Sequence, residues 1–280
     1  MIVYRTKQDL ASHLEALRNQ GKSVGFVPTM GALHEGHASL ITKARSENDA
    51  LVVSIFVNPT QFDEPSDLEN YPRKMESDLR LLQSMKTDIA FTPSVIEMYP
   101  EEDTRTFDLG GLDRVMEGKY RTGHFNGVVQ IVSKLFETVR PDRAYFGRKD
   151  FQQLVIIQKL VQLMDMDITI VSCPIVREPD GLAMSSRNEL LTGEERKTAP
   201  LIYITLKIAR EKRSTLSPAE LKTWVTAQFE NQPLMDLEYF EIVNDSDLSP
   251  VQSWTGNVGK VGCIAVRLGK VRLIDNMNFD

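Results

Sequence analysis

VGFVPTMGALHEGH, residues 24–37, is the segment of this chain that is most informative about its fold class. Its first four residues form an apolar run that predicts a strand, and its end predicts the start of a helix that reaches about Asn48. A helix start offers unpaired backbone N–H groups and the positive end of the helix dipole. Gly31 and Gly36 allow the backbone to come close to a bound group. The stretch therefore predicts a strand, loop and helix that bind a phosphate chain.

Two histidines lie in this loop. His34 and His37 are three residues apart and fall on one face of the predicted helix, so both can reach the same anionic group. By itself the pair also fits half of a metal site, or two ordinary surface residues. The zinc-protease motif H-E-x-x-H requires one more residue between the histidines than the sequence has. No cluster of Cys or His lies near the pair in the sequence to complete a metal site, because the only other histidines are His13 and His124.

Composition limits the classes of protein to consider. The chain has 280 residues, of which 41% are hydrophobic and 26% charged, enough for one large domain and one small one. Its formal net charge of -6 argues against a general nucleic-acid binder, which would have a basic face. We expect no membrane span and no signal peptide, and therefore a cytoplasmic protein. Cys173 and Cys263 are expected to be buried free thiols.

Short apolar runs alternate with helical patterns through the first two-thirds of the chain. This alternation predicts an α/β fold with a doubly wound, Rossmann-like parallel sheet, whose ligands bind beyond the carboxyl ends of the strands. Val27, Val57 and Gly147 end at that edge. Strands are expected at 24–27, 51–57, 88–92, 143–147 and 167–171, and further helices at 74–85, 125–139 and 150–164.

The pattern changes after Pro174. Two helices and then three strand-like runs predict a second, smaller α+β domain. The prolines at 174 and 179 mark the best boundary, so we predict domains at 1–175 and 176–280. The helices are expected at 193–211 and 217–231, and the strands at 237–243, 262–268 and 271–274.

Two further loops carry polar groups suited to a nucleotide. In the first, Lys149 follows a strand end and is placed to contact phosphate oxygens. Asp150 next to it either accepts from ribose hydroxyls or simply caps the following helix. In the second, Ser185, Ser186 and Arg187 form a small polar loop suited to pyrophosphate oxygens, although a solvent-exposed loop would look similar.

Two glutamines are candidates for contacts to a small polar substrate. Gln61 follows the second strand of the alternating region, and Gln153 lies in the helix after Lys149. Their neutral amides suit hydroxyl and carboxylate groups. Surface glutamines are common, so the residue type alone leaves the ordinary interpretation open for both.

Five ordered blocks extend this pattern over almost the whole chain. They are PTMGALHEGH from Pro28, VNPTQF from Val57, RTGHFNGV from Arg121, FGRKDFQQ from Phe146 and MSSRN from Met184. With them the chain resembles the pantothenate synthetase family, the ligases of pantoate and β-alanine. The histidine loop and the SSR loop also look like the two signatures of class I aminoacyl-tRNA synthetases. The resemblance is looser in the C-terminal domain.

The resemblance implies an AMP-forming ligase that uses ATP and Mg²⁺, passes through a pantoyl adenylate, and forms a homodimer without nucleic-acid or membrane partners. It makes 1–175 the ATP- and pantoate-binding domain and 176–280 a lid that carries the SSR loop. The implied ATP-binding set comprises Met30, Gly31, Ala32, Leu33, His34, Glu35, Gly36, His37, Gly147, Arg148, Lys149, Asp150, Val176, Met184, Ser185, Ser186 and Arg187.

Individual roles also follow from the resemblance. The implied catalytic residues are His34 and His37 on the phosphates, with His37 as proton donor, Lys149 on the α-phosphate, and Ser185, Ser186 and Arg187 on the leaving pyrophosphate. The resemblance also implies that Gln61 and Gln153 bind pantoate and that Gln61 binds β-alanine. It implies that Asp150 binds the ribose, that backbone groups of Val176 contact adenine, and that Arg148 contributes only backbone contacts. Met30 shields the adenylate unless it is a plain core residue, Arg121 is a mobile anion contact, and the metal ligands are unknown.

Two other classes of function remain open from the sequence. A nucleotidyltransferase would use the same histidine loop but would retain the nucleotide in its product. A noncatalytic regulator would bind nucleotide in a retained pocket, although the intact Lys149, His37 and SSR loop fit that poorly. An RNA-linked synthetase is disfavoured by the acidic composition and the lack of a basic appended domain.

Overall fold

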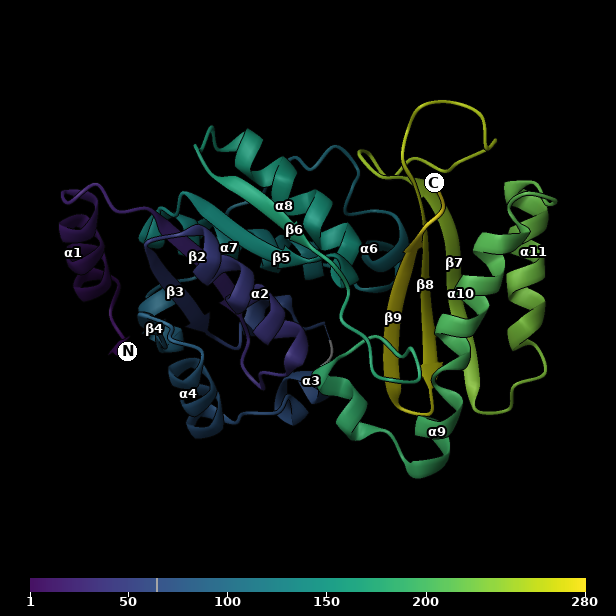
Figure 1. The fold of residues 1–280 in the computed structure, drawn as a ribbon, viewed down its shortest axis with the longest axis horizontal. Coiled ribbons are helices and arrows are strands. Elements are labelled where there is room, and N and C mark those ends of the chain that lie inside the picture. The colour runs from purple at the N-terminus through teal and green to yellow at the C-terminus, as the bar shows by residue number, and fades with distance from the viewer. Residues whose placement is uncertain (64) are drawn as a thin grey trace. The chain divides into compact units, whose positions relative to one another are not determined.

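A computed structural model describes residues 1–63 and 65–280 of the chain (Figure 1). The chain divides into two compact units. The first comprises Met1–Gly147 with Ile156–Cys173, and the second comprises Arg148–Val155 with Pro174–Asp280. The change of unit at Cys173 and Pro174 lies close to the predicted boundary. Residues 148–155, however, group with the C-terminal unit.

The described residues of the first unit form a six-stranded sheet of the order β1-β4-β3-β2-β5-β6, in which every recorded strand pair is parallel. Its central strands are continuous apolar runs, as expected of strands covered on both faces. The predicted doubly wound α/β sheet is confirmed. The strands are β1 (Ile2–Tyr4), β2 (Val24–Thr29), β3 (Ala50–Ile55), β4 (Ile89–Phe91), β5 (Arg143–Gly147) and β6 (Thr169–Cys173).

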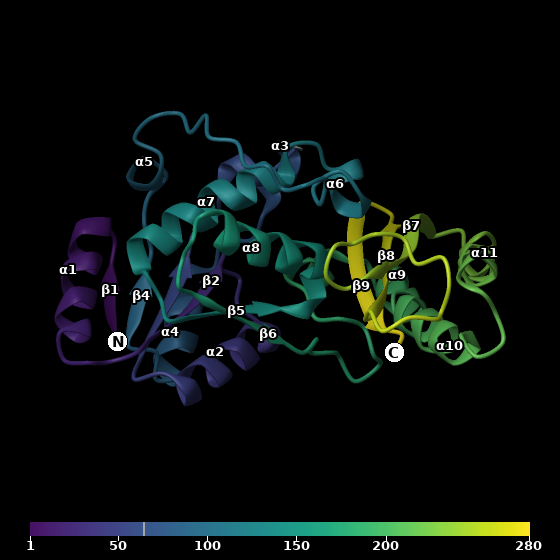
Figure 2. The same ribbon diagram turned by 90° about the horizontal axis from the view of Figure 1, so that it is seen from above.

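Helices cover both faces of this sheet. Figure 2 shows α2 and α4 on one face and α7 on the other. The helix α7 packs on β2 and buries most of its side chains. The helical segments along residues 1–173 are α1 (Lys7–Arg18), α2 (Glu35–Glu47), η1 (Pro59–Gln61), α3 (Pro65–Asn70), α4 (Met75–Ser84), α5 (Val95–Met98), α6 (Met116–Tyr120), α7 (His124–Val139), η2 (Arg148–Asp150) and α8 (Phe151–Leu163).

The strand order reverses at β2. This strand pairs with β3 on one side and with β5 on the other. From β2 the chain proceeds toward β3, and from β5 it proceeds away from β2 toward β6. In a doubly wound sheet, the crevice at such a reversal lies outside the carboxyl ends of the two strands and is where ligands bind. The histidine loop follows the carboxyl end of β2, and the turn with Lys149 follows that of β5.

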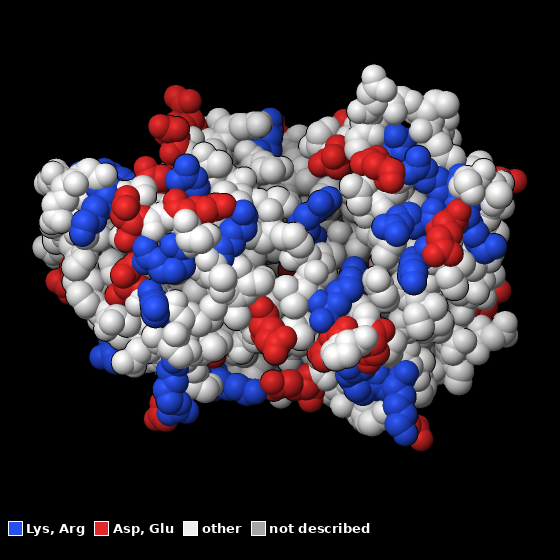
Figure 3. Space-filling view, in the orientation of Figure 1, with Lys and Arg blue, Asp and Glu red and all other residues white. Residues whose placement is uncertain are grey.

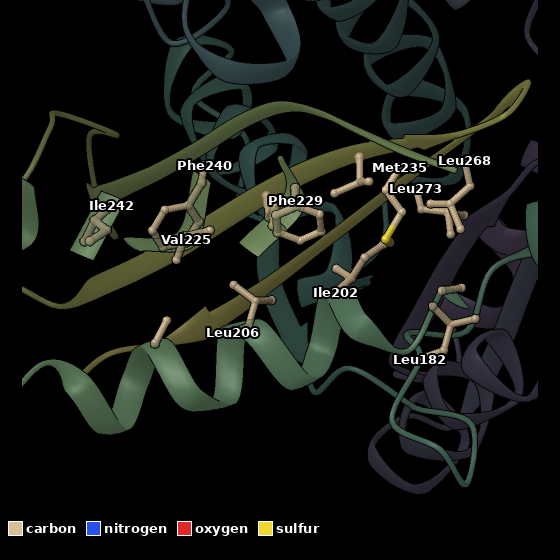
Figure 4. Close-up of a cluster of buried hydrophobic side chains, with 14 of the residues drawn as sticks. Leu182, Ile202, Leu206, Val225, Phe229, Met235, Phe240, Ile242, Leu268 and Leu273 are labelled. Carbon is tan, nitrogen blue, oxygen red and sulfur yellow. The ribbon is translucent and has the colours of Figure 1, made fainter. Parts of the chain in front are cut away.

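The second unit is an antiparallel three-stranded sheet, β7-β8-β9, with helices packed on it, as the sequence predicts. Figure 4 shows Ile202 and Leu206 of one helix facing apolar side chains such as Phe240 from the sheet. The strands are β7 (Met235–Asn244), β8 (Lys260–Leu268) and β9 (Val271–Asn278), and the helical segments are η3 (Ser186–Leu190), α9 (Gly193–Thr198), α10 (Leu201–Lys212) and α11 (Pro218–Phe229).

One predicted helix of this unit is divided. The sequence pattern gives a single helix at 193–211, whereas the structure has α9 and α10 separated at Ala199 and Pro200. Proline has no backbone N–H, so it cannot donate to the carbonyl four residues earlier and interrupts the helical ladder. The apolar face of α10 then packs on the sheet independently of α9.

The chemical character of the surface and of the cysteines agrees with the sequence. Figure 3 shows Lys and Arg side chains beside Asp and Glu on the face drawn. Described ion pairs of this kind include Lys222–Glu241 and Arg267–Glu238. Cys173 and Cys263 are free and buried. Within the described part of the chain, no helix has both the length and the apolar character to cross a membrane.

Candidate active site

Backbone N–H groups fix the tautomers of the two histidines in the loop after β2. His34 is the N-cap of α2, and its Nδ1 accepts from the backbone N–H of Gly36 at 3.1 Å. The Nδ1 of His37 accepts in turn from the backbone N–H of His34 at 3.3 Å, and the two ring centres are 4.1 Å apart. An Nδ1 that accepts carries no proton, so each neutral ring carries its proton on Nε2. Both rings therefore offer an Nε2–H donor, which is what an anionic oxygen requires.

A buried carboxylate accepts hydrogen bonds from the backbone of this loop. Asp78 of α4 is 3% exposed and accepts from two consecutive backbone N–H groups, those of Ala32 and Leu33, both at 2.9 Å. Gly31 has a φ of +85°, and a Cβ there would come within 3.0 Å of the same carboxylate. A side chain at this position would therefore be strained and crowded. Asp78 fixes the path of the loop, and no pattern in the sequence predicted this role.

Gln61 is buried at the end of η1 and has a fixed amide orientation. Its Oε1 accepts from the Nδ2 of Asn58 at 3.2 Å, and its Nε2 lies 3.1 Å from the Sδ of Met30. Asn58 is 1% exposed and also accepts a hydrogen bond from the hydroxyl of Tyr99 at 2.8 Å. Met30 and Gln61, both predicted site residues, are therefore in contact. Asn58 lies within the VNPTQF block, but its role depends on this network and was not predicted.

His124 holds the backbone of Gln61. Its Nδ1 lies 2.7 Å from the carbonyl oxygen of Gln61, which can only accept, so Nδ1 carries the proton. The Nε2 then accepts from the guanidinium of Arg121 at 3.1 Å. Burial, and next the charge of Arg121, lower the pKa of His124 to about 4. Arg121 also lies 3.7 Å from the carboxylate of Asp63, and its predicted role as an anion contact stays a prediction.

Close backbone packing brings α7 onto η1. A Cβ on Gly127 would lie 2.3 Å from the carbonyl oxygen of Thr60. Glycine at this position therefore lets the helix approach the turn that carries Gln61. The carbonyl of Gly127 also accepts from the Nδ2 of Asn58 at 3.0 Å. The RTGHFNGV block thus serves the geometry of Gln61.

The second group of predicted residues begins with the η2 turn. The Nζ of Lys149 lies 3.9 Å from the carboxylate of Asp150, and the Lys149 side chain is largely covered. The side chain of Asn276 donates to the carbonyl oxygens of Arg148 and Lys149. Gln153 follows in α8 and is partly buried.

The SSR loop is ordered by local hydrogen bonds. The Oγ of Ser185 accepts from the backbone N–H of Arg187 at 3.3 Å and caps η3. The Nδ2 of Asn188 donates to the carbonyl of Ala183 at 3.1 Å. The backbone N–H of Met184 donates to the carbonyl of Val176 at 3.0 Å, so these two predicted residues face each other across a hairpin.

The predicted site residues thus fall into two groups, each assembled within its own unit. His34, His37, Met30, Gln61 and Arg121 belong to the first unit. The second unit holds residues 148–150, Gln153, Val176 and residues 184–187. The described residues contain no group of three His, Cys, Asp or Glu side chains that could hold a metal ion.

The sequence profile of the pantoate-β-alanine ligase family matches residues 2–278. The chain belongs to the pantoate-β-alanine ligase family. This confirms the resemblance that the five sequence blocks indicate, and it extends the match through the C-terminal unit, where the blocks are less distinctive.

Individual members of the family are similar in sequence to this chain along their whole length. The pantothenate synthetase of Bacteroides thetaiotaomicron is 54% identical over 279 residues, which are 100% of this chain and 99% of the relative. That of Porphyromonas gingivalis is 50% identical over 280 residues, with 100% of both chains covered.

Solved structures of ligases in this family share the fold. The pantothenate synthetase of Thermus thermophilus superposes with a TM-score of 0.93 at 41% identity, covering 100% of this chain and 99% of that one. The pantoate-β-alanine ligase of Francisella tularensis, described as complexed with beta-gamma ATP and β-alanine, gives 0.81 at 36% identity, covering 100% and 98%. The predicted fold of a parallel sheet with a smaller second unit is confirmed by both.

Proposed function

We propose that this ligase joins the carboxyl group of pantoate to the amine of β-alanine through a pantoyl adenylate, at the expense of ATP. The proposal rests first on His34 and His37, whose Nδ1 atoms accept backbone hydrogen bonds at the start of α2 and at the reversal of the sheet order, which assigns the ring proton of each to Nε2. The match to the ligase family over residues 2–278 indicates which substrates are used. The Francisella relative, described with a form of ATP and β-alanine, supports the same pair of co-substrates.

The reaction has two displacement steps. In the first, a carboxylate oxygen of pantoate attacks the α-phosphorus of ATP, and the bond from that phosphorus to the bridging oxygen breaks to release pyrophosphate. In the second, the amine of β-alanine attacks the acyl carbon, loses a proton and expels AMP. The first step brings an anion to a polyanion, so positioned donors lower its barrier by balancing the negative charge.

The histidine pair and the η2 turn supply those donors in this proposal. The Nε2–H groups of His34 and His37 donate to phosphate oxygens, and His37 donates most directly to the oxygen that gains charge. The ammonium of Lys149 follows the α-phosphate. The hydroxyls of Ser185 and Ser186 and the guanidinium of Arg187 bind the leaving pyrophosphate.

Other residues bind the organic parts of the substrates. The amide of Gln61, whose Oε1 is engaged by Asn58, offers its Nε2–H₂ to pantoate, and Gln153 completes that contact. Asp150 accepts from the ribose hydroxyls, and backbone groups of Val176 meet the adenine. The Met30 side chain, beside Gln61, keeps water from the acyl adenylate.

ATP enters this scheme as its magnesium complex. Mg²⁺ in proteins is commonly held by substrate phosphates, water and one or two carboxylates, so an ion bound together with ATP would need few ligands from the protein. From the family resemblance we also infer a homodimer, a cytoplasmic location, and a lid role for the C-terminal unit. Light scattering of the purified protein tests the dimer directly.

Pantoate-dependent exchange of labelled pyrophosphate into ATP tests the proposed chemistry. The label should enter ATP only when pantoate is present, and later addition of β-alanine should release AMP. A nucleotidyltransferase would release pyrophosphate and keep the nucleotide in its product, with no AMP on addition of β-alanine. Lack of exchange in folded protein with pantoate would contradict the proposal and favour a nucleotide-binding regulator.

A further inference from the structure

A single side chain of the C-terminal sheet holds the turn that presents Lys149. Asn276 of β9 is 4% exposed, and its Nδ2 donates to the carbonyl oxygens of Arg148 and Lys149 at 2.8 and 2.9 Å. An amide nitrogen has two hydrogens, and both are used here. A three-residue turn makes few hydrogen bonds of its own, so the two bonds from Asn276 fix where its backbone lies.

The residue beside Asn276 is anchored on the opposite face of the same strand. Asp275 is 4% exposed, and its carboxylate accepts two hydrogen bonds from the guanidinium of Arg177, at 2.6 and 3.0 Å. The guanidinium carbon of Arg177 also lies 4.3 Å from the ring centre of Tyr203. One carboxylate oxygen of Asp275 accepts in addition from the backbone N–H of Asn276 at 2.7 Å. The backbone at these two residues is therefore fixed from both sides.

Arg177 connects this strand to the SSR loop. It forms an antiparallel bridge with Ala183, in the hairpin that leads into residues 184–187. Its guanidinium also donates to the carbonyl of Gly181 at 3.0 Å. Two adjacent residues of β9 are thus connected to both polar loops of the second unit. Asn276 contacts the η2 turn directly, and Asp275 is connected to the SSR loop through Arg177, which pairs with Ala183.

We propose that Asn276 is a positioning residue that sets the place of Lys149, while Asp275 and Arg177 hold the SSR hairpin to the same point of β9. The catalytic part of this inference rests on the proposed function, because that function gives Lys149 its phosphate. Asn276 acts through the Lys149 backbone and does not itself touch the substrate.

Hydrogen exchange tests the positioning without reference to activity. In Asn276→Ala, backbone amides from 148 to 152 should exchange about 10-fold faster in the unliganded protein, because two buried hydrogen bonds are lost. Asn276→Asp should behave in the same way, since a carboxylate cannot donate to the two carbonyls, whereas a role in filling space would tolerate it. Asn276→Ser is the milder variant if the alanine protein does not fold, and it should give an intermediate increase.

Asn278→Ala is the matched control. Asn278 is the same residue type two positions along β9 on the same face, but it is exposed, and its Oδ1 accepts from the backbone N–H of Asp280 at 3.0 Å. Exchange at residues 148–152 should not change in this variant. Unchanged exchange in folded Asn276 variants, or an equal increase in the control, would overturn the proposal.

A double-mutant cycle tests the route through Lys149. Asn276→Ala should lower the rate of pantoate-dependent pyrophosphate exchange about 10-fold in the natural protein, but less than about 2-fold when Lys149 is already alanine. A merely structural loss would multiply with the Lys149→Ala loss, and that result would contradict the proposal. If the natural protein shows no exchange of pyrophosphate, the proposed function fails, and the hydrogen-exchange result still decides whether Asn276 holds the turn.

Discussion

The backbone N–H of His34 donates to the Nδ1 of His37, so one imidazole that we assign to phosphate binding also caps the helix that carries it. Substitution by alanine would remove the cap and the Nε2–H donor together. His37→Asn separates the two roles, because an asparagine oxygen can accept at the place of Nδ1 while the Nε2–H is lost.

For His37→Asn we predict a loss of about 10²- to 10³-fold in the rate of pyrophosphate exchange, the usual effect of removing one donor to developing charge. The melting temperature should stay close to that of the natural protein, because the cap is kept. The rate and the thermal unfolding curve are measured on the same preparation. Unchanged turnover in the folded variant would remove His37 from the proposed chemistry.

Asp78→Asn tests the support of the histidine loop. The amide keeps the shape of the carboxylate, but its NH₂ group faces one of the two backbone N–H groups that donate hydrogen bonds to Asp78. Loss of a buried acceptor costs about 1–3 kcal/mol of the free energy of unfolding. We expect a loss of that order in urea unfolding, together with about a 10-fold higher KM for ATP.

Glu76→Gln is the control for Asp78→Asn. Glu76 lies on the same helix with an 88% exposed side chain, and its carboxylate is 3.6 Å from Arg80. Glu76→Gln removes the same charge from α4 as Asp78→Asn does, and it should change the free energy of unfolding by less than about 0.5 kcal/mol. Equal effects of the two substitutions would show that charge on α4, and not the two hydrogen bonds, matters to the loop.

Gln61→Ala should weaken pantoate binding and leave ATP binding intact. The amide is oriented by Asn58 and faces Met30, in the group of residues that we assign to pantoate. A lost hydrogen bond to a charged carboxylate predicts a rise of about 10- to 100-fold in the KM for pantoate. Separate titrations with each substrate measure this. Weakened ATP binding with normal pantoate binding would move Gln61 to the nucleotide site.

His124 predicts a pH dependence of stability. Its pKa is about 4 in the folded protein, mainly because it is buried, and about 6.5 in an unfolded chain. Between these values the unfolded chain binds the proton and the folded protein does not, so stability falls as the pH drops from about 6.5 to about 4. The full effect is about 3 kcal/mol, at about 1.4 kcal/mol for each pKa unit.

His124→Asn should remove this part of the acid dependence, because asparagine does not titrate in the range. Free energies of unfolding of both proteins are measured from pH 7 to pH 4. Parallel curves for the two proteins would mean that the folded protein takes up the proton at His124 as easily as the unfolded chain does.

The periodic elements of the fold were predictable from the sequence because their apolar patterns are strong. The strands at 24–27 and 51–57 and the helix at 125–139 are buried runs whose burial follows from their own residues. The strand β1 and the helix α1 were not predicted. The three residues of β1 are largely exposed, and α1 buries Leu10 and Leu14 alone, so neither gives a clear pattern.

Loop motifs and the family resemblance predicted the candidate site residues. They did not predict the residues that hold those site residues in place. Asp78 contacts a loop 46 residues away along the chain, and Asn276 contacts a turn 127 and 128 residues away. Each is a single polar residue within an otherwise ordinary helix or strand. Only the tertiary structure reveals that they hold the backbone of the two loops.

Pantoate-dependent pyrophosphate exchange, compared between the natural protein and folded Lys149→Ala, is the decisive experiment. We predict that label enters ATP only with pantoate, and that Lys149→Ala lowers the rate about 10²- to 10³-fold. Exchange that is independent of pantoate, or a Lys149→Ala protein that turns over at the natural rate, would contradict this prediction.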